Sequence, residues 1–373
     1  MPQKKLASLI YIHDFPIAVS EGCAFYSVGL PESYFDRFLT VTDEVELITR
    51  KRGLDTLKNK DSYSKSKNNF VKLSSLCQHS YLLMFATIFK ERKRIRESFI
   101  VLNFPSILAL FILIIIRPRF YSIEHANDDN IFNNKRLGFF LHKVILSIKS
   151  RVFRNSLGVL AVSEYLENKD YPPIKEFASN VNLVPQSFYK RSPDFGKLIF
   201  LTVGAVTYKK GIDLALKFFE NYKYDFEYHV LGEIIDIDIN ETVTKNPKLA
   251  SKVTLHGVCD SELVAHMFKN CNIYIQPSRA EGLPRATLEA MAFSLPCITS
   301  MHPCFSNIVP LIQRVDWNRD MEVEKAIEIL KEKDVYNDAC KHSYELSQKF
   351  TPEVLKPKRK NYYERVIDEL PNS

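Results

Sequence analysis

Short apolar, β-branched runs alternate with longer amphipathic stretches along most of the chain. In the first half, the runs that predict buried strands are SLIYIH (8–13), EVELIT (44–49), FIVLNF (99–104), FYSIEH (120–125) and GVLAVS (158–163). In the second half they are KLIFLTVG (197–204), EYHVLGE (227–233), VTLHG (253–257), NIYIQPS (272–278) and PCITS (296–300). Helical patterns such as GIDLALKFFENY and SELVAHMFKNC lie between them. Because strands that alternate with helices form parallel sheets with crossover connections, the pattern predicts an α/β chain with two Rossmann-like, doubly wound halves.

The strand rhythm is interrupted at NLVPQSFYKRSPDFGK, residues 182–197, which combines two prolines, a glycine and polar residues. A chain of 373 residues also exceeds what one core comfortably holds. We therefore expect an N-terminal domain at 1–186 and a C-terminal domain at 187–352, followed by a charged, helix-forming tail at 353–373.

The longest apolar run, ILALFILIII at 107–116, is too short to cross a bilayer, which takes about 20 residues. It predicts a buried helix or strand, with partial insertion into a membrane interface as the alternative.

The N-terminal MPQKKLASLIYIHDF lacks the long apolar region of a signal peptide. Seven scattered cysteines without a C-x-x-C pair indicate reduced thiols and no zinc site. We expect a cytoplasmic protein, either soluble or peripheral at the inner membrane.

The net charge of +7 is concentrated in two places. Residues 50–72 hold eight basic side chains against two acidic ones, and KERKRIRE follows at 90–97. Such stretches form solvated surfaces, or they attract anionic lipid head groups or a phosphorylated lipid substrate. We expect no nucleic-acid partner, because no recognised nucleic-acid-binding motif accompanies the charge.

The stretch EGLPRATLEAMA, 281–292, joins a loop to a predicted helix and carries Glu281 and Glu289. A helix N-terminus offers unpaired amides and a positive dipole end, here at Gly282, Leu283 and Arg285. Amides and carboxylates together suit a ligand with both phosphate and hydroxyl groups. From spacing alone, a helix whose Glu289 faces solvent remains open.

A second loop, in LTVGAVTYKKGIDLALKFF, follows a strand that ends at Gly204 and carries Lys209 and Lys210 before the next helix. Lysines at such a turn can neutralise a diphosphate, so no metal ion is needed. The alternative is a solvated pair of lysines.

The stretch PSRAEGLPRATLEAMAFSLPCITS resembles the E-x7-E signature of glycosyltransferase family 4, a retaining nucleotide-sugar family with the GT-B fold. This resemblance implies that Glu281 contacts the donor sugar and Glu289 the ribose of the nucleotide. It also places Lys210 on the lysine that contacts the leaving diphosphate. The family's arginine position is Ala205 in this chain, and Lys209 is the residue that could compensate.

The resemblance extends to the loops at Gly232 and Gly257, which are similar to those that pack on the nucleotide base. The first half resembles enzymes of bacterial capsule and surface polysaccharide synthesis. Their Gly-Gly pair is absent, and Gly22 and Gly29 are the nearest candidates for it on the acceptor side. His125 falls where relatives carry a residue near the reacting sugar, with a purely structural histidine as the alternative. The tail is expected to pack back on the first domain.

The resemblance implies a retaining, metal-independent transferase in which Lys210, Glu281 and His125 are the catalytic candidates. It would use a nucleoside diphosphate sugar as donor, a glycan or lipid-linked glycan as acceptor and no cofactor. Two alternatives remain open: a GT-B nucleotide-sugar epimerase, and a membrane-peripheral protein that binds nucleotide sugars without turnover.

Overall fold

The computed structural model divides the chain into two compact units, one of residues 1–180 with 356–373 and one of residues 181–355. The boundaries between the units lie after residues 180 and 355, whereas the sequence analysis placed them after residues 186 and 352. The residues described are 4–27, 30–57, 60, 63–67, 69–126, 136–179, 181, 183–235 and 237–371, with side chains from 143 onward in the helix that begins at 136.

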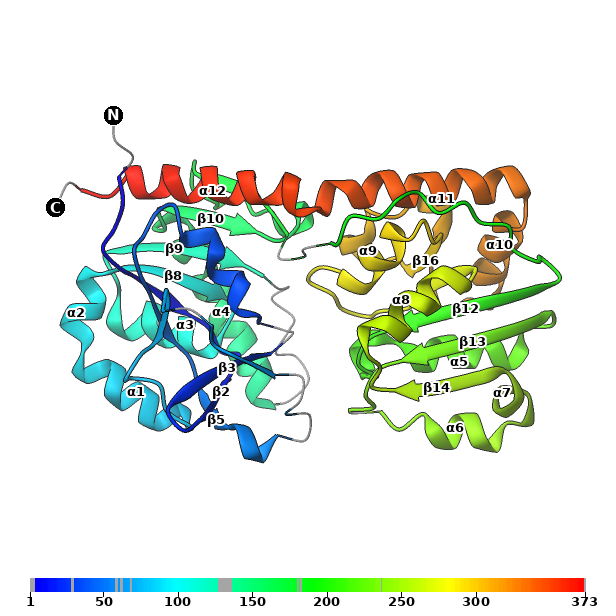
Figure 1. Ribbon diagram of the computed structural model, residues 1–373, viewed down its shortest axis with the longest axis horizontal. Helices are drawn as coiled ribbons and strands as arrows, with labels where there is room; N and C mark the ends of the chain where they lie inside the picture. Colours follow the sequence, from blue (N-terminus) through cyan, green and yellow to red (C-terminus); the bar gives the residue numbers. More distant parts are fainter. Residues whose placement is uncertain are drawn as a thin grey trace. The chain divides into compact units, whose positions relative to one another are not determined.

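Unit 1 is built on a seven-stranded parallel sheet in the order β11-β10-β9-β8-β1-β4-β7. Figure 1 labels its neighbouring strands β8, β9 and β10. Its strands are β1 (Leu9–Ile12), β4 (Val45–Ile48), β7 (Val71–Leu73), β8 (Phe99–Phe104), β9 (Phe120–His125), β10 (Gly158–Ala161) and β11 (Lys175–Phe177). Its helices include α1 (Tyr81–Lys90), α2 (Arg92–Glu97), α3 (Ile107–Phe111) and α4 (Arg136–Arg154). The five strands expected from the sequence are present, and β1, β8 and β9 are wholly or almost wholly buried because both faces of the sheet are covered.

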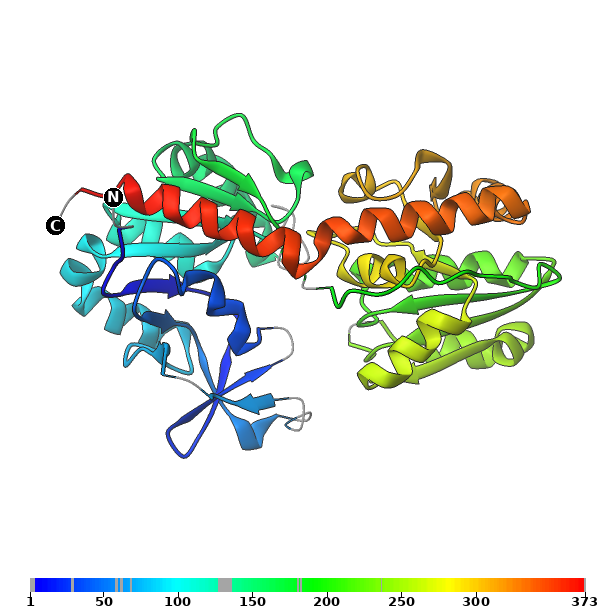
Figure 2. The same ribbon diagram turned by 45° about the horizontal axis from the view of Figure 1, so that its top comes forward.

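A second, four-stranded sheet follows the carboxyl ends of β1 and β4 in the order β5-β2-β3-β6. Its strands are β2 (Ile17–Ser20), β3 (Cys23–Ser27), β5 (Lys51–Gly53) and β6 (Tyr63–Lys65). In the turned view this small sheet, in blue, stands off the body of unit 1 (Figure 2). The sequence analysis did not predict it.

The apolar run forms helix α3, which continues into a π-helical turn, η4 (Ile112–Ile116). Leu108, Ala109 and Ile112 are buried against the sheet, whereas Ile114 and Ile115 are exposed by 37% and 50%. The run is therefore helical, as one of the two predicted forms, but only one side of it is buried. No helix within the described ranges is both long and apolar enough to cross a membrane.

Unit 2 holds a six-stranded parallel sheet in the order β14-β13-β12-β15-β16-β17. Its strands are β12 (Lys197–Val203), β13 (Asp225–Leu231), β14 (Val253–Gly257), β15 (Ile273–Gln276), β16 (Cys297–Ser300) and β17 (Arg314–Val315). Its helices are α5 (Ile212–Asn221), α6 (Asn240–Lys245), α7 (Pro247–Lys252), α8 (Ser261–Asn270), α9 (Arg285–Ala292), α10 (Asp320–Leu330) and α11 (Lys333–Ser347). Phe219 of α5 stacks on Phe226 and packs against Phe200 and Tyr228 of the sheet. These aromatic contacts form part of the core of unit 2.

The last helix, α12 (Pro352–Asp368), contributes its residues from 356 onward to unit 1. The Tyr362 hydroxyl and the Ser122 hydroxyl of β9 lie 2.6 Å apart, and Tyr362 and Val366 pack against Gly158 of β10. Figure 1 shows α12 running along these strands.

Candidate functional site

The carboxyl ends of β12 and β15 form the switch point of the unit 2 sheet, because the chain continues from β12 to β13 on one side and later places β15 on the other. Ligands of doubly wound sheets bind at such a point. There the Lys210 ammonium lies 2.5 Å from the Glu281 carboxylate, and this ion pair joins the loop after β12 to the loop after β15. The structure thus brings together the two residues that the sequence singled out 71 positions apart.

A chain of buried side chains holds the Glu281 carboxylate. The Tyr274 hydroxyl donates to Gln276 Oε1 at 2.5 Å, and Gln276 Nε2 donates to Glu281 Oε1 at 3.2 Å and to Ser278 Oγ at 2.6 Å. Ser278 Oγ donates to the same Glu281 oxygen at 2.9 Å. Gln276 and Ser278 were not assigned from the sequence, although Gln276 ends β15 and Ser278 lies in the loop that leads to Glu281.

Three glycines end consecutive strands and lie against one another. The Gly204 amide donates to the carbonyl of Leu231, directly before Gly232, and the Gly232 amide donates to the Gly257 carbonyl. A Cβ on Gly232 would lie 1.9 Å from the Gly204 oxygen, so no side chain fits there. The Lys210 side chain packs 3.7 Å from the position of a Cβ on Gly204. The result is a shelf of bare backbone beside the Lys210–Glu281 pair.

Arg279 ties the two loops together a second time. Its guanidinium forms a double hydrogen bond with the Asp213 carboxylate at 2.8 and 2.7 Å, and its amide donates to the Lys209 carbonyl at 2.7 Å. Because Asp213 neutralises Arg279, this arginine does not replace the cation that is absent at Ala205.

Of the three backbone amides expected to be available for a ligand before helix α9, two are available and one is not. Gly282 and Leu283 donate to no acceptor within the described part of the chain, which fits the expected anion contact. The Arg285 amide donates to the Leu283 carbonyl at 2.9 Å, so the expectation that it is free is wrong. Pro284 is the residue before the first helical turn, and its φ of −80° and ψ of 74° are those of an inverse γ-turn, which brings the Arg285 amide onto the Leu283 carbonyl. The Arg285 side chain is exposed.

Glu289 lies on α9 with its side chain partly buried. Burial raises the pKa of its carboxyl, and Arg285, one turn earlier, opposes this in part. Among the described residues Glu289 has no hydrogen-bond or ion-pair partner. Burial, with Glu281 and Glu289 adding to it, raises the pKa of the Tyr274 hydroxyl, so both carboxylates lie near the same buried ring. A partly buried carboxylate without donors is costly and is suited to ligand hydroxyls.

In unit 1 the strand order places the switch point between β1 and β8. His13 follows β1, stacks on Tyr11, and accepts a hydrogen bond at Nδ1 from the Phe15 amide at 2.8 Å. Burial lowers the pKa of His13 to about 4. The imidazole is therefore neutral near pH 7 with its proton on Nε2, and it can donate to a bound hydroxyl or carbonyl. His13 was missed in the sequence, where only its place after a strand pointed to it.

The carboxylate of Asp14 caps the first turn of α3, accepting from the amides of Ile107 at 2.6 Å and Leu108 at 3.0 Å. Burial raises the pKa of this carboxyl. The protein's own anion thus takes the place that a ligand phosphate would need at this helix end.

His125 ends β9 as predicted, but it is only 1% exposed. Its ring packs among Phe104, Phe153 and Tyr171, and Nδ1 lies 2.5 Å from the Tyr171 hydroxyl. Since that hydroxyl also donates to the Leu166 carbonyl, Nδ1 carries the imidazole proton. These contacts account for a structural histidine, and a catalytic role for His125 stays a prediction.

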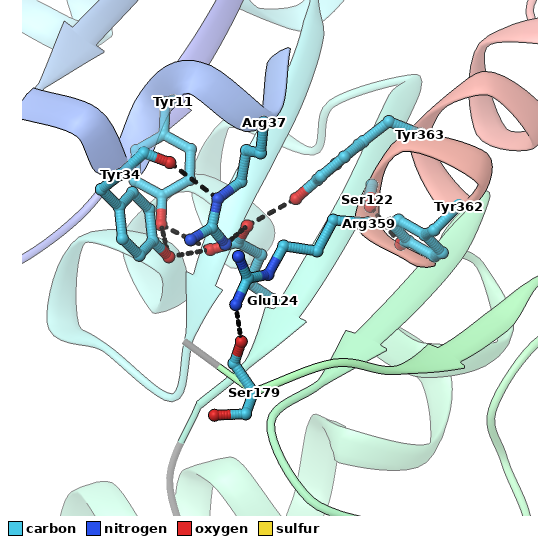
Figure 3. Close-up of polar contacts among 9 residues, drawn as sticks. All are labelled: Tyr11, Tyr34, Arg37, Ser122, Glu124, Ser179, Arg359, Tyr362 and Tyr363. Atoms are coloured by element: carbon cyan, nitrogen blue, oxygen red, sulfur yellow. Dashed lines mark hydrogen bonds and ion pairs between the residues drawn. The ribbon is translucent and has the colours of Figure 1, made fainter. Parts of the chain in front are cut away.

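Beside His125, Glu124 is the centre of a fully buried polar network (Figure 3). Its carboxylate accepts from Tyr11 at 2.6 Å, from Tyr363 at 2.5 Å and from Tyr34, and it pairs with Arg37 at 3.0 Å. Burial opposes the charge, but Arg37 and the three hydroxyl donors outweigh it and leave the pKa of Glu124 below its usual value. The network fixes β1 and β9 beside the switch point and joins them to α12.

Gly22 lies with Glu21 in the two-residue turn between β2 and β3, and both residues have positive φ, 48° and 76°. This geometry matches a type I′ hairpin and explains the glycine without a ligand. Gly29 lies outside the described residues. Within the described ranges no group of three or more His, Cys, Asp or Glu side chains is arranged to hold a metal ion.

Residues 186–339 match the protein family described as glycosyl transferases, group 1. CapJ of Staphylococcus aureus is 25% identical over 312 residues, which is 78% of each chain. The amylovoran biosynthesis glycosyltransferase AmsK of Erwinia amylovora is 27% identical over 179 residues, 44% of this chain and 43% of its own.

Solved structures share the fold. Sucrose-phosphate synthase of Thermosynechococcus elongatus superposes with a TM-score of 0.69 at 14% identity, covering 97% of this chain and all of its own. HepE of Anabaena, solved with UDP-glucose, gives a TM-score of 0.62 at 11% identity over the same shares. These glycosyltransferases have the GT-B fold of two Rossmann-like domains, and both units described above conform to it.

Proposed function

We propose that this chain, a group 1 glycosyltransferase with the GT-B fold, moves a sugar from a nucleoside diphosphate sugar to a hydroxyl of a glycan or lipid-linked glycan in bacterial surface polysaccharide synthesis. The observation that carries the proposal is the Lys210–Glu281 pair, which joins two loops at the switch point inside the matched region. CapJ and AmsK support the surface-polysaccharide context. Retention, metal independence and membership of the narrower family 4 rest on the E-x7-E resemblance.

In this proposal the donor lies on the bare backbone formed by Gly204, Gly232 and Gly257. Its base packs on the backbone at Gly232 and Gly257, its ribose diol donates to Glu289, and its diphosphate faces Lys210 and the amides of Gly282 and Leu283. Glu281, held by Gln276 and Ser278, accepts from the sugar hydroxyls. Lys209 adds positive charge at the same loop, and Arg285 contributes through its exposed side chain.

The reaction proceeds on one face of the sugar. The bond from the anomeric carbon to the diphosphate oxygen breaks while the acceptor oxygen bonds to that carbon from the same side. The acceptor proton passes to the departing phosphate oxygen, so no protein base is required. Catalysis then consists of positioning and stabilisation of the leaving charge, which Lys210 and the two amides supply without a metal ion.

The acceptor is proposed to approach the carboxyl edge of the unit 1 sheet, where His13 offers Nε2–H. The small sheet at this edge carries Lys51, Arg52 and Lys65, which suits an acceptor with a phosphate group. Such an enzyme would work in the cytoplasm at the inner face of the membrane.

A donor screen tests the proposal. UDP-, GDP-, ADP- and dTDP-sugars are compared by thermal shift, and the stabilising donor is then assayed for hydrolysis and transfer with and without a chelator. NMR of the product reports the anomeric configuration. Lys210→Met should lower kcat by roughly 10²–10³-fold, as loss of one preorganised donor does. Glu289→Gln should weaken donor binding about tenfold.

Exposed residues of the same unit provide matched controls. Lys217→Met and Glu262→Gln make the same chemical changes at exposed positions, and they should leave kcat and the affinity for the donor unchanged. Donor binding without any turnover would favour a non-catalytic binding protein. Conversion of the donor to an isomeric nucleotide sugar would favour an epimerase.

A further inference from the structure

A pocket of about 500 Å³ lies in unit 1, away from the candidate site. It is formed by η4, by the turn that leads into β9, and by the end of α4, which leads into β10. Its lining residues are Leu113, Ile114, Arg117, Pro118, Arg119, Tyr121, Ile148, Arg151, Val152 and Asn155. Because these segments precede their strands, the pocket lies at the amino edge of the sheet, opposite the edge that carries His13.

Three arginines line this pocket and no acidic residue does. Arg117 is held in place by its Nε, which donates to the Ile114 carbonyl at 3.1 Å. Arg119 pairs with Glu97 at 3.0 Å on the exposed surface, and Arg151 has no hydrogen-bond or ion-pair partner in the described chain. The pocket therefore holds a positive charge that the protein does not neutralise.

The backbone conformation of Arg117 is also unusual. This residue ends the π-helical turn with a φ of 54°, a left-handed conformation in which glycine or asparagine is the common choice. An arginine there carries a conformational cost that glycine would not, and its guanidinium returns one hydrogen bond to the helix end, at the Ile114 carbonyl.

The rest of the pocket is apolar. Leu113, Ile148 and Val152 line it, and the hydroxyl of Tyr121 is occupied by the Val152 carbonyl at 2.9 Å. Ile114, which lines it, and the adjacent Ile115 are exposed by 37% and 50%. A ligand that fits must present an anion to the arginines and hydrocarbon to the exposed side chains.

The two basic stretches found in the sequence lie at opposite edges of the unit 1 sheet. KERKRIRE includes α2, which leads into β8 at the amino edge, and the Arg119 amide donates to the Arg96 carbonyl, so this cluster adjoins the pocket. Residues 51–53 and 63–65 belong to the small sheet at the carboxyl edge. One flat membrane surface cannot contact both edges. Exposed apolar side chains lie at both, Ile114 and Ile115 at the amino edge and Leu82 and Leu83 at the start of α1 at the carboxyl edge. The amino edge adds the pocket with Arg117 and Arg151.

We propose that the pocket binds the phosphate head group of an anionic phospholipid, with Arg117 and Arg151 at the phosphate and Ile114 and Ile115 in the acyl region. Arg119, paired with Glu97, lies at the rim. Charge complementarity selects the lipid: two arginines without an acidic partner among the described residues face one phosphodiester, and a zwitterionic head group would bring a third cation. The amino edge of unit 1 is then the membrane-facing surface, and the carboxyl edge stays open to substrates.

Vesicle flotation of the full-length chain tests this proposal. Phosphatidylcholine vesicles are compared with vesicles that also contain phosphatidylglycerol, and only the latter should bind the protein. Arg117→Gln with Arg151→Gln should weaken this binding by about fivefold per arginine. Ile114→Ser with Ile115→Ser should weaken it as well. Thermal unfolding of each variant confirms that unit 1 is folded.

Arg154→Gln is the matched control, because Arg154 lies on the same helix without lining the pocket, and its binding should stay as in the unchanged protein. An equal loss in Arg154→Gln and Arg151→Gln would mean diffuse attraction and would overturn the proposal. Binding of inorganic phosphate that depends on Arg117 and Arg151, without vesicle binding, would identify a site for a soluble anion and would also overturn it.

Discussion

A single hydrogen bond decides what His13 can do. Because its Nδ1 accepts from the Phe15 amide, the neutral ring keeps its proton on Nε2, and burial keeps the ring neutral down to about pH 4. In the unfolded chain the same histidine has an ordinary pKa near 6.5. Between these values the unfolded state binds a proton that the folded state does not, so the stability of unit 1 should fall as the pH is lowered from about 6.5 to 4.

The size of this effect follows from the shift. Each pH unit by which the pH falls in that window lowers the free energy of unfolding by about 1.4 kcal/mol, or by roughly 3 kcal/mol in total. Denaturant unfolding of the wild type and of His13→Gln, measured from pH 7 to pH 4, should show the difference, since glutamine does not titrate. Asp14 and Glu124 lie near His13 and titrate in both proteins, so they cancel in the comparison. Equal pH slopes would contradict the assigned pKa of His13.

Residues that belong to one continuous motif could be predicted from the sequence, and residues that act across loops could not. Glu281 and Lys210 stand out because each follows a strand in a recognisable pattern. Arg279 gains its role from Asp213, 66 positions away in the chain. Gln276 lies inside the motif, but its contacts with Ser278 and Glu281 depend on how the loop after β15 folds back. The free amide predicted at Arg285 was wrong, because the turn at Leu283 and Pro284 consumes it.

At the scale of elements, one arginine in the segment before β12 fastens two helices. Arg191 is 7% exposed and donates to carbonyls at the ends of α8 and α9: Phe268 at 2.5 Å, Lys269 at 3.3 Å, Cys271 at 2.6 Å, Phe293 at 2.8 Å and Ser294 at 3.0 Å. A helix C-terminus exposes unpaired carbonyls and attracts cations. The sequence identified this segment only as a polar linker.

Replacement of this arginine should therefore destabilise unit 2. Arg191→Met removes the donor from five carbonyls, three of them in buried hydrogen bonds, and should lower the free energy of unfolding by about 3 kcal/mol, a fall of roughly 10 °C in Tm. Arg191→Lys keeps the charge but not the planar fork, so it should recover only part of the loss. Calorimetry of the three proteins measures both effects. A methionine variant as stable as the wild type would show that water satisfies these carbonyls.

Long, buried elements were predictable and short, half-exposed ones were not. The ten expected strands are present because each is a run of apolar residues between helical patterns. The strands of the small sheet have three to five residues and carry charged or polar side chains at their edges, as edge strands commonly do. The turn at Glu21 and Gly22 was the one local signal for its hairpin.

At the scale of the whole molecule, the chain contains two separate cores with different duties. All the predicted donor contacts lie in unit 2, whereas the Glu124 network and residues 356–373 belong to unit 1. The sequence showed that the strand rhythm restarts near residue 190. That the tail packs back on the first domain was expected from the family resemblance alone. The contacts that hold residues 356–373 in unit 1, such as Tyr363 with Glu124 and Arg359 with the Ser179 carbonyl, do not follow from the strand pattern.

Two cores predict two independent unfolding transitions. Glu124→Gln leaves Arg37 buried without its counter-charge and should destabilise unit 1 by about 3 kcal/mol, while Tyr363→Phe removes one of the hydroxyl donors and should cost about 1 kcal/mol. A bound nucleotide sugar should raise only the unit 2 transition, because a ligand stabilises the state that binds it. Differential scanning calorimetry of the wild type and both variants, with and without donor, separates the effects. If Glu124→Gln and the donor instead shift a single shared transition, the two units unfold as one cooperative body.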